Sequence, residues 1–459
     1  MRLRHVLVGA ALLVPASAHA ALVIKAAPTS NVTCAGDTCT ATAADATLNI
    51  KTLKTMLKRG NADVVSGSLA GDIEIGTALP WTSNATLTLD AYHSIRIARA
   101  VTVESTGGLT LITNDGGMGG DLSFPEYGHV NFWDLTSALT IDGHAYTLVG
   151  DIATLATDIN ANHYDGYYAL AANYDAGPDG SYAAPPVYQV NDVFEGLGNS
   201  ISNLTMYNGT SGTWTGLIRY IKGAVRNVAL LNVAITGYAD GGAVGYENDG
   251  TISRVSSTGS IHVSDGGGLT FYNKGTIIFS HSSASVSGTG FVGGLVSINT
   301  GLSPAIIQSF ATGTVFTGGT AGGLVSTNSG TITACYSRGD VSGGTGVYSG
   351  GFIAMNYSEN PIAQAYETGA VTGGGRFGGA GGFIGQNGIS PVSAAYWDQT
   401  TTGMSGKTNG TGDHKHTTGI TPTTSAKLKA ALLDGFDPAL WGLDHAINGG
   451  FPYLLNNPR

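Results

Sequence analysis

Short apolar runs separated by glycine, serine and asparagine recur between Gly241 and Gly406. A glycine pair followed by apolar residues opens each unit: Gly241-Gly242-Ala243-Val244, Gly267-Gly268-Leu269-Thr270, Gly293-Gly294-Leu295-Val296, Gly322-Gly323-Leu324-Val325, Gly350-Gly351-Phe352-Ile353 and Gly381-Gly382-Phe383-Ile384. The runs are rich in Val, Ile, Thr, Phe and Tyr, are too short for helices, and are separated by residues typical of turns. The pattern therefore predicts strands joined by turns.

A repeat of this length is typical of solenoids. Three short strands per unit give one coil of a parallel β-helix, in which each strand pairs with its equivalent one coil away, about 4.8 Å along the axis. We predict an all-β fold, a right-handed parallel β-helix with short helical insertions and a C-terminal cap. A disordered Gly/Ser tract is the alternative, and the recurrent Leu, Val, Ile and aromatic residues argue against it.

Stacked coils place equivalent side chains in rows, and two rows are predicted. The first is a structural ladder of hydrogen-bonded asparagines: Asn248, Asn273, Asn299, Asn328, Asn356 and Asn387. The second is an aromatic stack: Phe310, Tyr336, Tyr366 and Tyr396. Both rows are expected to support the fold.

Further coils are predicted over residues 21–137, where apolar residues alternate with period two, as in Ile73-Glu74-Ile75. Within them, Leu48 to Arg59 has helical spacing and predicts a short amphipathic helix that caps the open end of the stack.

A helical and loop insertion is predicted over residues 138–190. It contains a helix over Asp151 to Asn160, followed by a tyrosine cluster made of Tyr164, Tyr167, Tyr168 and Tyr174. The cluster is expected to pack the insertion onto the solenoid, and a sugar or protein contact surface is the alternative. The repeat coils follow over 191–406. Residues 407–459 predict a loop and a C-terminal cap, in which Trp441 to Leu454 close the hydrophobic core.

The first twenty residues have the pattern of a secretory signal peptide, with a basic start, an apolar run from Val6 to Val14 and the small-residue site Ala18-His19-Ala20. The apolar run is shorter than the roughly 20 residues that span a membrane, so no transmembrane span is predicted. Removing this segment takes away two arginines and no acids, which changes the formal net charge from −10 to −12. Charged residues make up only 11 % of the chain, and the acidic balance argues against a nucleic-acid partner.

Cys34 and Cys39 are predicted to form a disulfide in an oxidising compartment. A metal bound by this pair is the alternative, but no second pair or histidine cluster completes such a site. Cys335 lies in a repeat strand and is expected to be a buried thiol. In the segment Asp413-His414-Lys415-His416 the side chains are expected to be solvated, with weak metal binding as the alternative. We therefore predict no metal site, no cofactor and no catalytic residues.

The six units resemble the GLUG motif of bacterial surface exoproteins of the filamentous-haemagglutinin type and of some immunoglobulin A peptidases. Leu295 and Leu324 carry the motif's leucine, and Ala243, Phe352 and Phe383 stand at the equivalent position. The resemblance implies an extracellular or cell-surface protein, adhesin-like and non-catalytic, that binds a glycan or protein ligand on another cell. It also implies an outer-membrane secretion partner. The usual Asn-Pro secretion motif is missing near the predicted mature N-terminus, so the periplasm remains an alternative location.

A carbohydrate-active enzyme, either a polysaccharide lyase or a hydrolase, is the second functional hypothesis, because parallel β-helices also carry such activities. These enzymes need clustered carboxylates. Asp340 and Glu367 fall at related positions beside Arg338. A solvated surface ion pair is the preferred interpretation, and a catalytic carboxylate pair that approaches Arg338 is the alternative. A peptidase is the third hypothesis, and no separate catalytic domain is evident for it.

Overall fold

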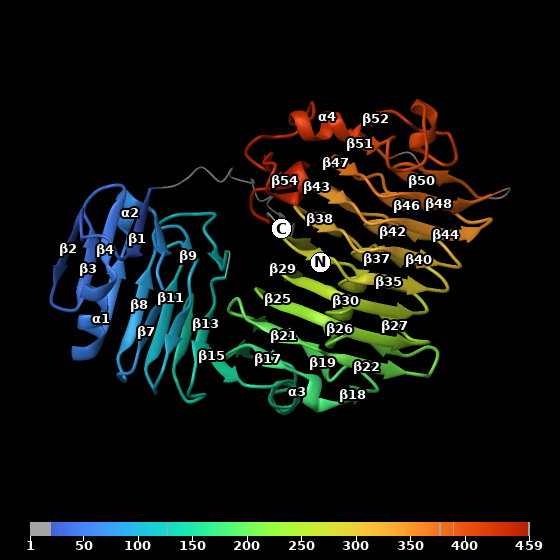
Figure 1. The fold of residues 1–459 in the computed structure, drawn as a ribbon. Helices are drawn as coiled ribbons and strands as arrows, with labels where there is room; N and C mark the ends of the chain where they lie inside the picture. The colour runs from blue at the N-terminus through green and yellow to red at the C-terminus, as the bar shows by residue number, and fades with distance from the viewer. Residues whose placement is uncertain (1–19, 126, 376–377, 389, 458–459) are drawn as a thin grey trace, which may run out of the picture.

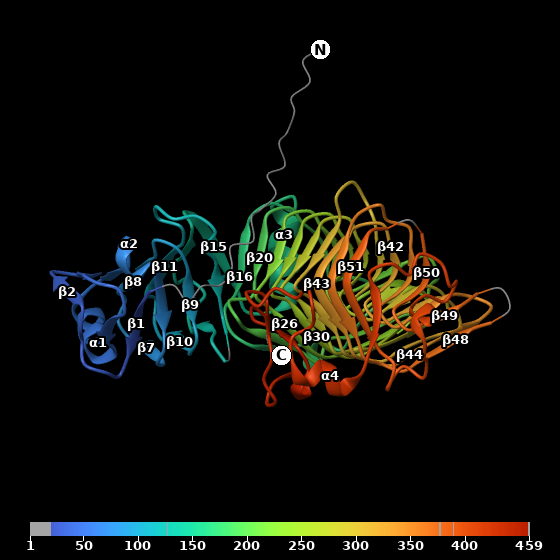
Figure 2. The same cartoon turned by 90° about the horizontal axis from the view of Figure 1, so that it is seen from above.

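The chain winds into a mostly β, parallel β-solenoid of about 15 turns, which confirms the predicted fold class. The computed structural model describes residues 20–459 apart from 126, 376–377, 389 and 458–459. The predicted signal peptide lies outside the described residues, except for Ala20. Among the described residues, no helix is long and apolar enough to cross a membrane. Figures 1 and 2 show two consecutive stacks of coils, which we call the N-terminal stack (blue to teal) and the C-terminal solenoid (green to red).

Three parallel sheets form the N-terminal stack (residues 21–141). The first contains β4 (Ala46–Asn49), β1 (Ala21–Lys25), β6 (Asp72–Ile75), β9 (Ile95–Ile97) and β12 (Leu122–Ser123). The second contains β7 (Leu79–Trp81), β10 (Val101–Val103) and β13 (Val130–Phe132). The third contains β3 (Thr38–Ala41), β5 (Ala62–Val65), β8 (Thr86–Asp90), β11 (Gly108–Ile112) and β14 (Leu139–Ile141). Apolar residues such as Leu87, Leu109 and Leu139 align and are buried, so the period-two pattern becomes rows of aliphatic side chains.

The predicted capping helix is present as α1 (Ile50–Arg59), while Leu48 belongs to β4. The Asn49 side chain accepts from Lys51 N at 2.8 Å and caps the helix, and Leu53 and Leu57 are buried in the core. The helix packs against β4 and β7, the edge strand of the second sheet. It therefore occupies the place of a strand in the first coil. A second short helix, α2 (Gly67–Ala70), follows β5.

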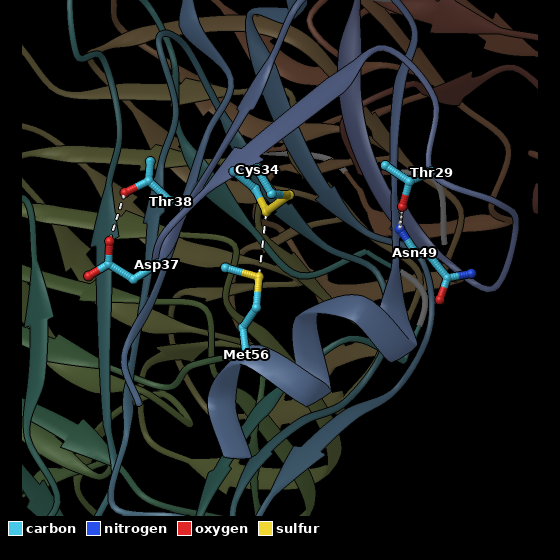
Figure 3. Close-up of a disulfide and its surroundings, with 7 residues drawn as sticks. Thr29, Cys34, Asp37, Thr38, Asn49 and Met56 are labelled. Atoms are coloured by element: carbon cyan, nitrogen blue, oxygen red, sulfur yellow. Dashed lines mark hydrogen bonds between the residues drawn. A yellow bond between two sulfur atoms is a disulfide. The ribbon is translucent and has the colours of Figure 1, made fainter. Parts of the chain in front are cut away.

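A disulfide joins Cys34 and Cys39 across the hairpin of β2 (Val32–Ala35) and β3 (Figure 3). The sulfur of Met56 on α1 lies 3.5 Å from the Cys39 sulfur. The bridge therefore lies over the capping helix at the start of the stack.

Two walls of the C-terminal solenoid (residues 144–423) are made of short strands. The first holds β19 (Val187–Val190), β24 (Ile218–Ile221), β28 (Gly245–Asn248), β32 (Thr270–Asn273), β37 (Val296–Asn299), β42 (Val325–Asn328), β46 (Ile353–Asn356) and β50 (Ile384–Asn387). The second holds β23 (Trp214–Thr215), β27 (Asp240–Gly241), β31 (Gly266–Gly267), β36 (Val292–Gly293), β41 (Ala321–Gly322), β45 (Ser349–Gly350) and β49 (Ala380–Gly381).

A long wall closes the coils and bends along its length. Its strands are β16 (Tyr167–Leu170), β17 (Tyr174–Asp175), β18 (Ser181–Tyr182), β20 (Val193–Glu195), β21 (Ser200–Ser202), β22 (Thr205–Asn208), β25 (Ala224–Arg226), β26 (Ala229–Gly237), β29 (Thr251–Ser253), β30 (Ser256–Val263), β33 (Thr276–Ile278), β34 (His281–Ser282), β35 (Ser285–Gly288), β38 (Ala305–Ile307), β39 (Phe310–Ala311), β40 (Val315–Thr317), β43 (Thr331–Ser337), β44 (Val341–Thr345), β47 (Ile362–Glu367), β48 (Val371–Gly374), β51 (Val392–Asp398) and β52 (Ile420–Thr423). A short helix, η1 (Gly177–Asp179), lies between β17 and β18.

The observed strand pairing shifts the predicted alignment of the first repeat by one residue. Gly241 pairs with Gly266, so Gly242 is the equivalent of Gly267. In the same way Val244, rather than Ala243, is the equivalent of Leu269. A glycine is required at this corner because the backbone passes too close to leave room for a side chain. A Cβ on Gly322 would lie 1.9 Å from the Val325 carbonyl oxygen, a contact that real Cβ atoms do not make.

Residues 138–190 are the junction between the two stacks, which corrects the predicted insertion. Asp142 and Gly143 turn the chain between β14 and β15 (His144–Val149), which pair antiparallel, and β15 then pairs parallel with β16. On β16, Ala169 belongs to the core of the N-terminal stack and Leu170 to the core of the C-terminal solenoid. One strand is thus shared by both cores.

The predicted helix in this range is present as α3 (Ile152–Ala161). The Asp151 side chain accepts from Thr154 N at 2.6 Å and caps the helix, which packs against the edge strand β19. The helix therefore covers the first edge of one wall of the C-terminal solenoid.

The long wall bends at a row of left-handed residues with φ between 43° and 55°: Leu197, Asn227, Arg254, Phe279, Gln308, Ala334, Gln364 and Ala394. Their side chains contact neighbours outside the coil. Leu197 joins the core of the N-terminal stack, and Arg254 forms an ion pair with Asp121 at 2.8 Å. Gln308 accepts from Asn456 at 3.1 Å. This row is the face on which both the N-terminal stack and the C-terminal tail dock.

The C-terminal tail (residues 424–457) begins beside the last strands at the end of the stack and then runs along this side of the solenoid (Figure 1). Trp441 packs on Tyr366 of the side wall, so the prediction that Trp441 to Leu454 close the end of the core is corrected. It comprises α4 (Ser425–Ala430), β53 (Trp441–Gly442), η3 (Asn448–Gly450) and β54 (Tyr453–Leu454). Asn457 donates to the carbonyl of Ser280, 177 residues earlier. The last coil is instead continued by the segment around η2 (Lys407–Gly410), since Phe383 N donates to Gly410 O at 3.0 Å.

Candidate ligand-binding corner

The structure brings the six asparagines into one buried row. Each Nδ2 donates to the Oδ1 of the next, at 2.7 Å from Asn248 to Asn273, from Asn273 to Asn299 and from Asn299 to Asn328, and at 2.9 Å from Asn328 to Asn356 and from Asn356 to Asn387. Asn387 ends the row by donating to the carbonyl of His416 at 2.8 Å. Because every amide lies inside the coil, the row stabilises the register and is not accessible to a ligand.

The aromatic residues also form a row, but on the docking face. Ring centroids are 4.5 Å apart from Phe310 to Tyr336 and 5.0 Å apart from Tyr336 to Tyr366, with nearly parallel planes. His281 extends the stack at its start, 4.5 Å from Phe310. Tyr396 is in register with Tyr366 but contacts Phe436 of the tail edge-on, at 5.8 Å. Since the tail covers these rings, they are packing residues.

The approach of Asp340 and Glu367 near Arg338 does not occur. Glu367 is fully buried, and its Oε2 accepts from Gly369 N at 3.1 Å. Asp340 is exposed and accepts from Ala370 N at 2.9 Å, while Arg338 donates to Asn448 Oδ1 in the tail at 2.5 Å. Their placement at related positions was wrong because Glu367 aligns with Ser337 and Trp397 rather than with Asp340.

No group of three or more His, Cys, Asp or Glu residues within the described ranges could hold a metal ion. The exposed His414 contacts the carbonyl of Thr408 at 3.3 Å. Cys335 is buried, and burial raises the pKa of its thiol to about 12, so it stays protonated at neutral pH.

Aromatic side chains gather on the outside of the first coils of the C-terminal solenoid, where the two short-stranded walls meet. We call this surface the aromatic corner. It comprises Tyr188, Trp214, Arg219, Tyr220, Tyr246, Phe271 and Tyr272, which come from β19, β23, β24, β28 and β32. All except Phe271 are partly or largely exposed, so they lie outside the core formed by Leu217 and Val244.

Tyr246 is at the centre of the aromatic corner. Its ring centroid lies 5.9 Å from that of Trp214, 6.3 Å from Tyr220 and 5.7 Å from Tyr272, in each case edge to face. The Arg219 guanidinium carbon lies 3.3 Å from the Trp214 ring centroid and 4.7 Å from that of Tyr220. Cation–π attraction therefore holds the rings and the arginine in fixed positions.

Charged side chains border the rings on one side. Lys222 forms a hydrogen-bonded ion pair with Asp249, and Lys274 pairs with Glu247 at 2.7 Å. Lys222 also lies 3.8 Å from Glu247. The row Tyr220, Glu247 and Tyr272 is in register from coil to coil, so polar and aromatic groups alternate along the solenoid axis.

Two aspartates border the rings on the other side. Asp240 is in register with Trp214, and Asp265 lies on the next coil, where its backbone carbonyl accepts from Gly241 N. Burial and then the charge of Asp265 raise the pKa of Asp240 to about 6. The Asp265 carboxylate accepts a hydrogen bond from Phe291 N.

Sequence reasoning missed the aromatic corner because it belongs mostly to coils that precede the regular repeats. A signal was present, however. A tyrosine is the second or third residue of the equivalent four-residue strand in four successive coils: Tyr188, Tyr220, Tyr246 and Tyr272. The tyrosines that the sequence did single out have packing contacts, as Tyr168 is buried and Tyr164 packs 5.3 Å from Tyr188.

A separate cavity of about 390 Å³ lies where the N-terminal stack, the C-terminal solenoid and the tail meet. Arg96, Phe124, Arg254 and Asn457 are among its lining residues. The Arg254 guanidinium lies 4.3 Å from the ring of Phe279, and burial lowers its pKa. Its ion pair with Asp121 crosses from one stack to the other, so the cavity is part of the docking face.

The fold defines a class, the parallel β-solenoid proteins, and the outer wall of the solenoid carries the aromatic corner. No protein-family model and no curated protein matches the chain. Two solved structures are similar. One is a candidate immunoglobulin A1 protease from Bacteroides ovatus, with a TM-score of 0.45 and 15 % identity, covering 68 % of this chain and 93 % of that one. The other is an IgA1 protease, with a TM-score of 0.39 and 23 % identity. The match covers 52 % of this chain and 20 % of the protease chain.

Proposed function

We propose that this protein is an exported, non-catalytic β-helical binding protein of the GLUG-repeat, adhesin-like type. The observation that carries the proposal is the aromatic corner, where partly exposed rings and a paired charge network are held in place on a rigid wall. Aromatic side chains and arginine are enriched at binding surfaces, and tyrosine and tryptophan give large contact areas at low entropic cost.

Two further observations support export. The Cys34–Cys39 disulfide is of the kind that forms in oxidising compartments, and the first twenty residues have the sequence pattern of a signal peptide. The negative formal net charge argues against a strongly anionic ligand.

The test combines localisation with cell binding. Cells that express the full chain are fractionated, and the purified protein is offered to bacterial and epithelial cells over a range of concentrations. We expect an extracytoplasmic protein that starts near Ala21 and binds cells saturably, and Tyr246→Ala is expected to weaken that binding. A cytoplasmic protein with an intact N-terminus, or cell binding that does not saturate, would contradict the proposal.

A second candidate function is glycan hydrolysis, and the aspartates beside Trp214 favour it. A glycosidase uses one protonated and one ionised carboxyl group. The raised pKa of Asp240 beside Asp265 meets the first requirement. We rank this function second because the Asp265 carboxylate is engaged by a backbone N–H. Release of reducing ends from a polysaccharide that is lost in Asp240→Asn would reverse the ranking.

A further inference from the structure

We propose that the aromatic corner binds a neutral polysaccharide whose chain runs along the solenoid axis, with about one sugar residue per coil. This inference rests on the proposed function and specifies its ligand class and site. Successive coils are about 4.8 Å apart, which is close to the length of one pyranose residue in an extended chain. In the coil-to-coil row Tyr220, Glu247 and Tyr272, aromatic and polar contacts alternate, so a ring recurs after two coils, which is about the length of two sugar residues.

The chemistry of the surface fits sugars. Pyranose rings have an apolar C–H face that packs on aromatic rings, and their hydroxyl groups take hydrogen bonds from fixed polar groups. The corner offers partly exposed rings at Trp214, Tyr246 and Tyr272. Beside them, Lys222 and Lys274 are donors and Glu247 is an acceptor, each held in place by ion pairs.

The charge of the corner favours a neutral chain over a polyanion. Its basic residues Arg219, Lys222 and Lys274 are nearly matched by acidic ones: Asp240, Glu247, Asp249 and Asp265. A nucleic acid or a sulfated glycan needs an excess of basic groups. This requirement is not met here.

The site has a definite length. At the position of Tyr220, Glu247 and Tyr272, the following coils carry Ile298, Thr327, Met355 and Gln386. At this strand position, aromatic and charged residues therefore end after β32. At its start, Tyr188 is 40 % exposed and packs on Tyr220, so the surface covers about four coils. The geometry fits a segment of about four sugar residues.

The test uses the purified full-length chain and neutral polysaccharides as probes: cellulose, xylan, mannan and β-1,3-glucan. Polygalacturonate and heparin are the anionic comparisons. We expect retention by at least one neutral polysaccharide and no stronger retention by either anionic one. With fragments of the bound polysaccharide, affinity measured by calorimetry should rise up to about four residues and then level off. Preference for an anionic probe, or equal affinity for fragments of two and six residues, would overturn the proposal.

Variants locate the site. Trp214→Ala and Tyr272→Ala should each weaken binding of the best neutral probe about tenfold, the loss expected from one ring contact of about 1.4 kcal/mol. Tyr357→Ala is the matched control, because this exposed tyrosine follows the asparagine row on a later coil. Trp214→Phe should restore part of the binding, and circular dichroism checks that each variant is folded. Unchanged binding in the folded Trp214→Ala and Tyr272→Ala variants would overturn the site assignment.

The same variants separate this inference from the proposed function. If no neutral polysaccharide binds but the protein still binds cells and loses this binding in Tyr246→Ala, the glycan inference fails and the binding function stands. If the protein binds neither cells nor any polysaccharide, both fail.

Discussion

The N-terminal stack and the C-terminal solenoid are built from the same kind of coil, but their interiors are fixed in different ways. In the N-terminal stack, rows of aliphatic residues such as Leu89 and Leu111 fill the core, and no asparagine is buried among its described residues. In the C-terminal solenoid, six successive coils each carry a buried asparagine, from Asn248 to Asn387, and each is hydrogen-bonded to the next. The aliphatic core determines only which side chains are buried. The asparagine ladder also determines the register, that is, which residue of one coil stacks on which residue of the next.

This difference explains why one stack repeats in sequence and the other does not. An aliphatic row accepts Leu, Ile or Val at each place, so the coils diverge while the pattern of burial stays the same. Each position of an amide ladder requires a side chain that donates a hydrogen bond to one neighbouring coil and accepts one from the other. The N-terminal stack has other constraints at its open end, namely helix α1 and the disulfide.

The largest effect is expected from a cavity in the aliphatic core. Leu89→Ala should destabilise the N-terminal stack by about 3–5 kcal/mol, because Leu89 is fully buried between Val64 and Leu111. Hydrogen-exchange mass spectrometry should show lost protection over residues 62–112 and unchanged protection beyond residue 240. Thr88→Ala, on the outer face of the same strand, is the control and should change little. Loss of protection throughout the chain would show that the two stacks unfold as one unit.

A break in the ladder should have the next largest effect. Asn328→Leu is expected to cost about 2–4 kcal/mol, because it leaves the amides of Asn299 and Asn356 without their buried partners. Chemical denaturation measures the loss. Asn387→Leu, at the end of the row, should cost less because only one asparagine loses its partner. Equal costs at the two positions would contradict a cooperative ladder.

The disulfide should contribute less than the ladder. Replacing both Cys34 and Cys39 by serine is expected to cost about 2 kcal/mol in the N-terminal stack, because the bridge closes a loop with a sequence separation of only 5. Reduction of the wild-type protein should give the same loss in thermal unfolding. A loss that appears in the C-terminal solenoid instead would contradict the assignment of the bridge to the first stack.

The smallest effect, and one of opposite sign, is expected at Glu367. Burial raises the pKa of this carboxyl well above its usual value, so the unfolded chain releases a proton that the folded chain keeps. Stability is therefore lost as pH rises above the ordinary glutamate pKa. Glu367→Gln should raise the melting temperature at pH 7 and leave it nearly unchanged at pH 4. Exposed Glu359→Gln is the control. Destabilisation at both pH values would show that the carboxylate is ionised and needed.

Much of the fold could be predicted from the sequence because residues that stack in successive coils recur at a regular spacing along the chain. The asparagines mark a single row, and α1 and α3 were visible from apolar spacing that buries Leu53 and Leu155. The first repeat was misaligned by one residue because glycines on both sides of the corner look alike in sequence. Only the pairing of Gly241 with Gly266 fixes the register.

The junction, the tail and the candidate site could not be predicted from the sequence. They depend on contacts that do not recur from coil to coil. Arg226 forms an ion pair with buried Glu195 at 2.7 Å and donates to Tyr146, 80 residues away. Trp441 packs against Tyr366 on the side wall rather than on the end of the core. Nothing in the local sequence specifies such partners. The aromatic corner was missed for the same reason, since Trp214 and Arg219 do not recur.

The central claim is that neighbouring coils stack residue on residue, and a pair of introduced cysteines tests it most directly. Ile298 and Thr327 are partners across adjacent coils, so Ile298→Cys with Thr327→Cys should form a disulfide on mild oxidation, detected by peptide mass spectrometry. Ile298→Cys with Met355→Cys spans two coils and should not form one. Cross-linking of the second pair but not the first would contradict the stacked register.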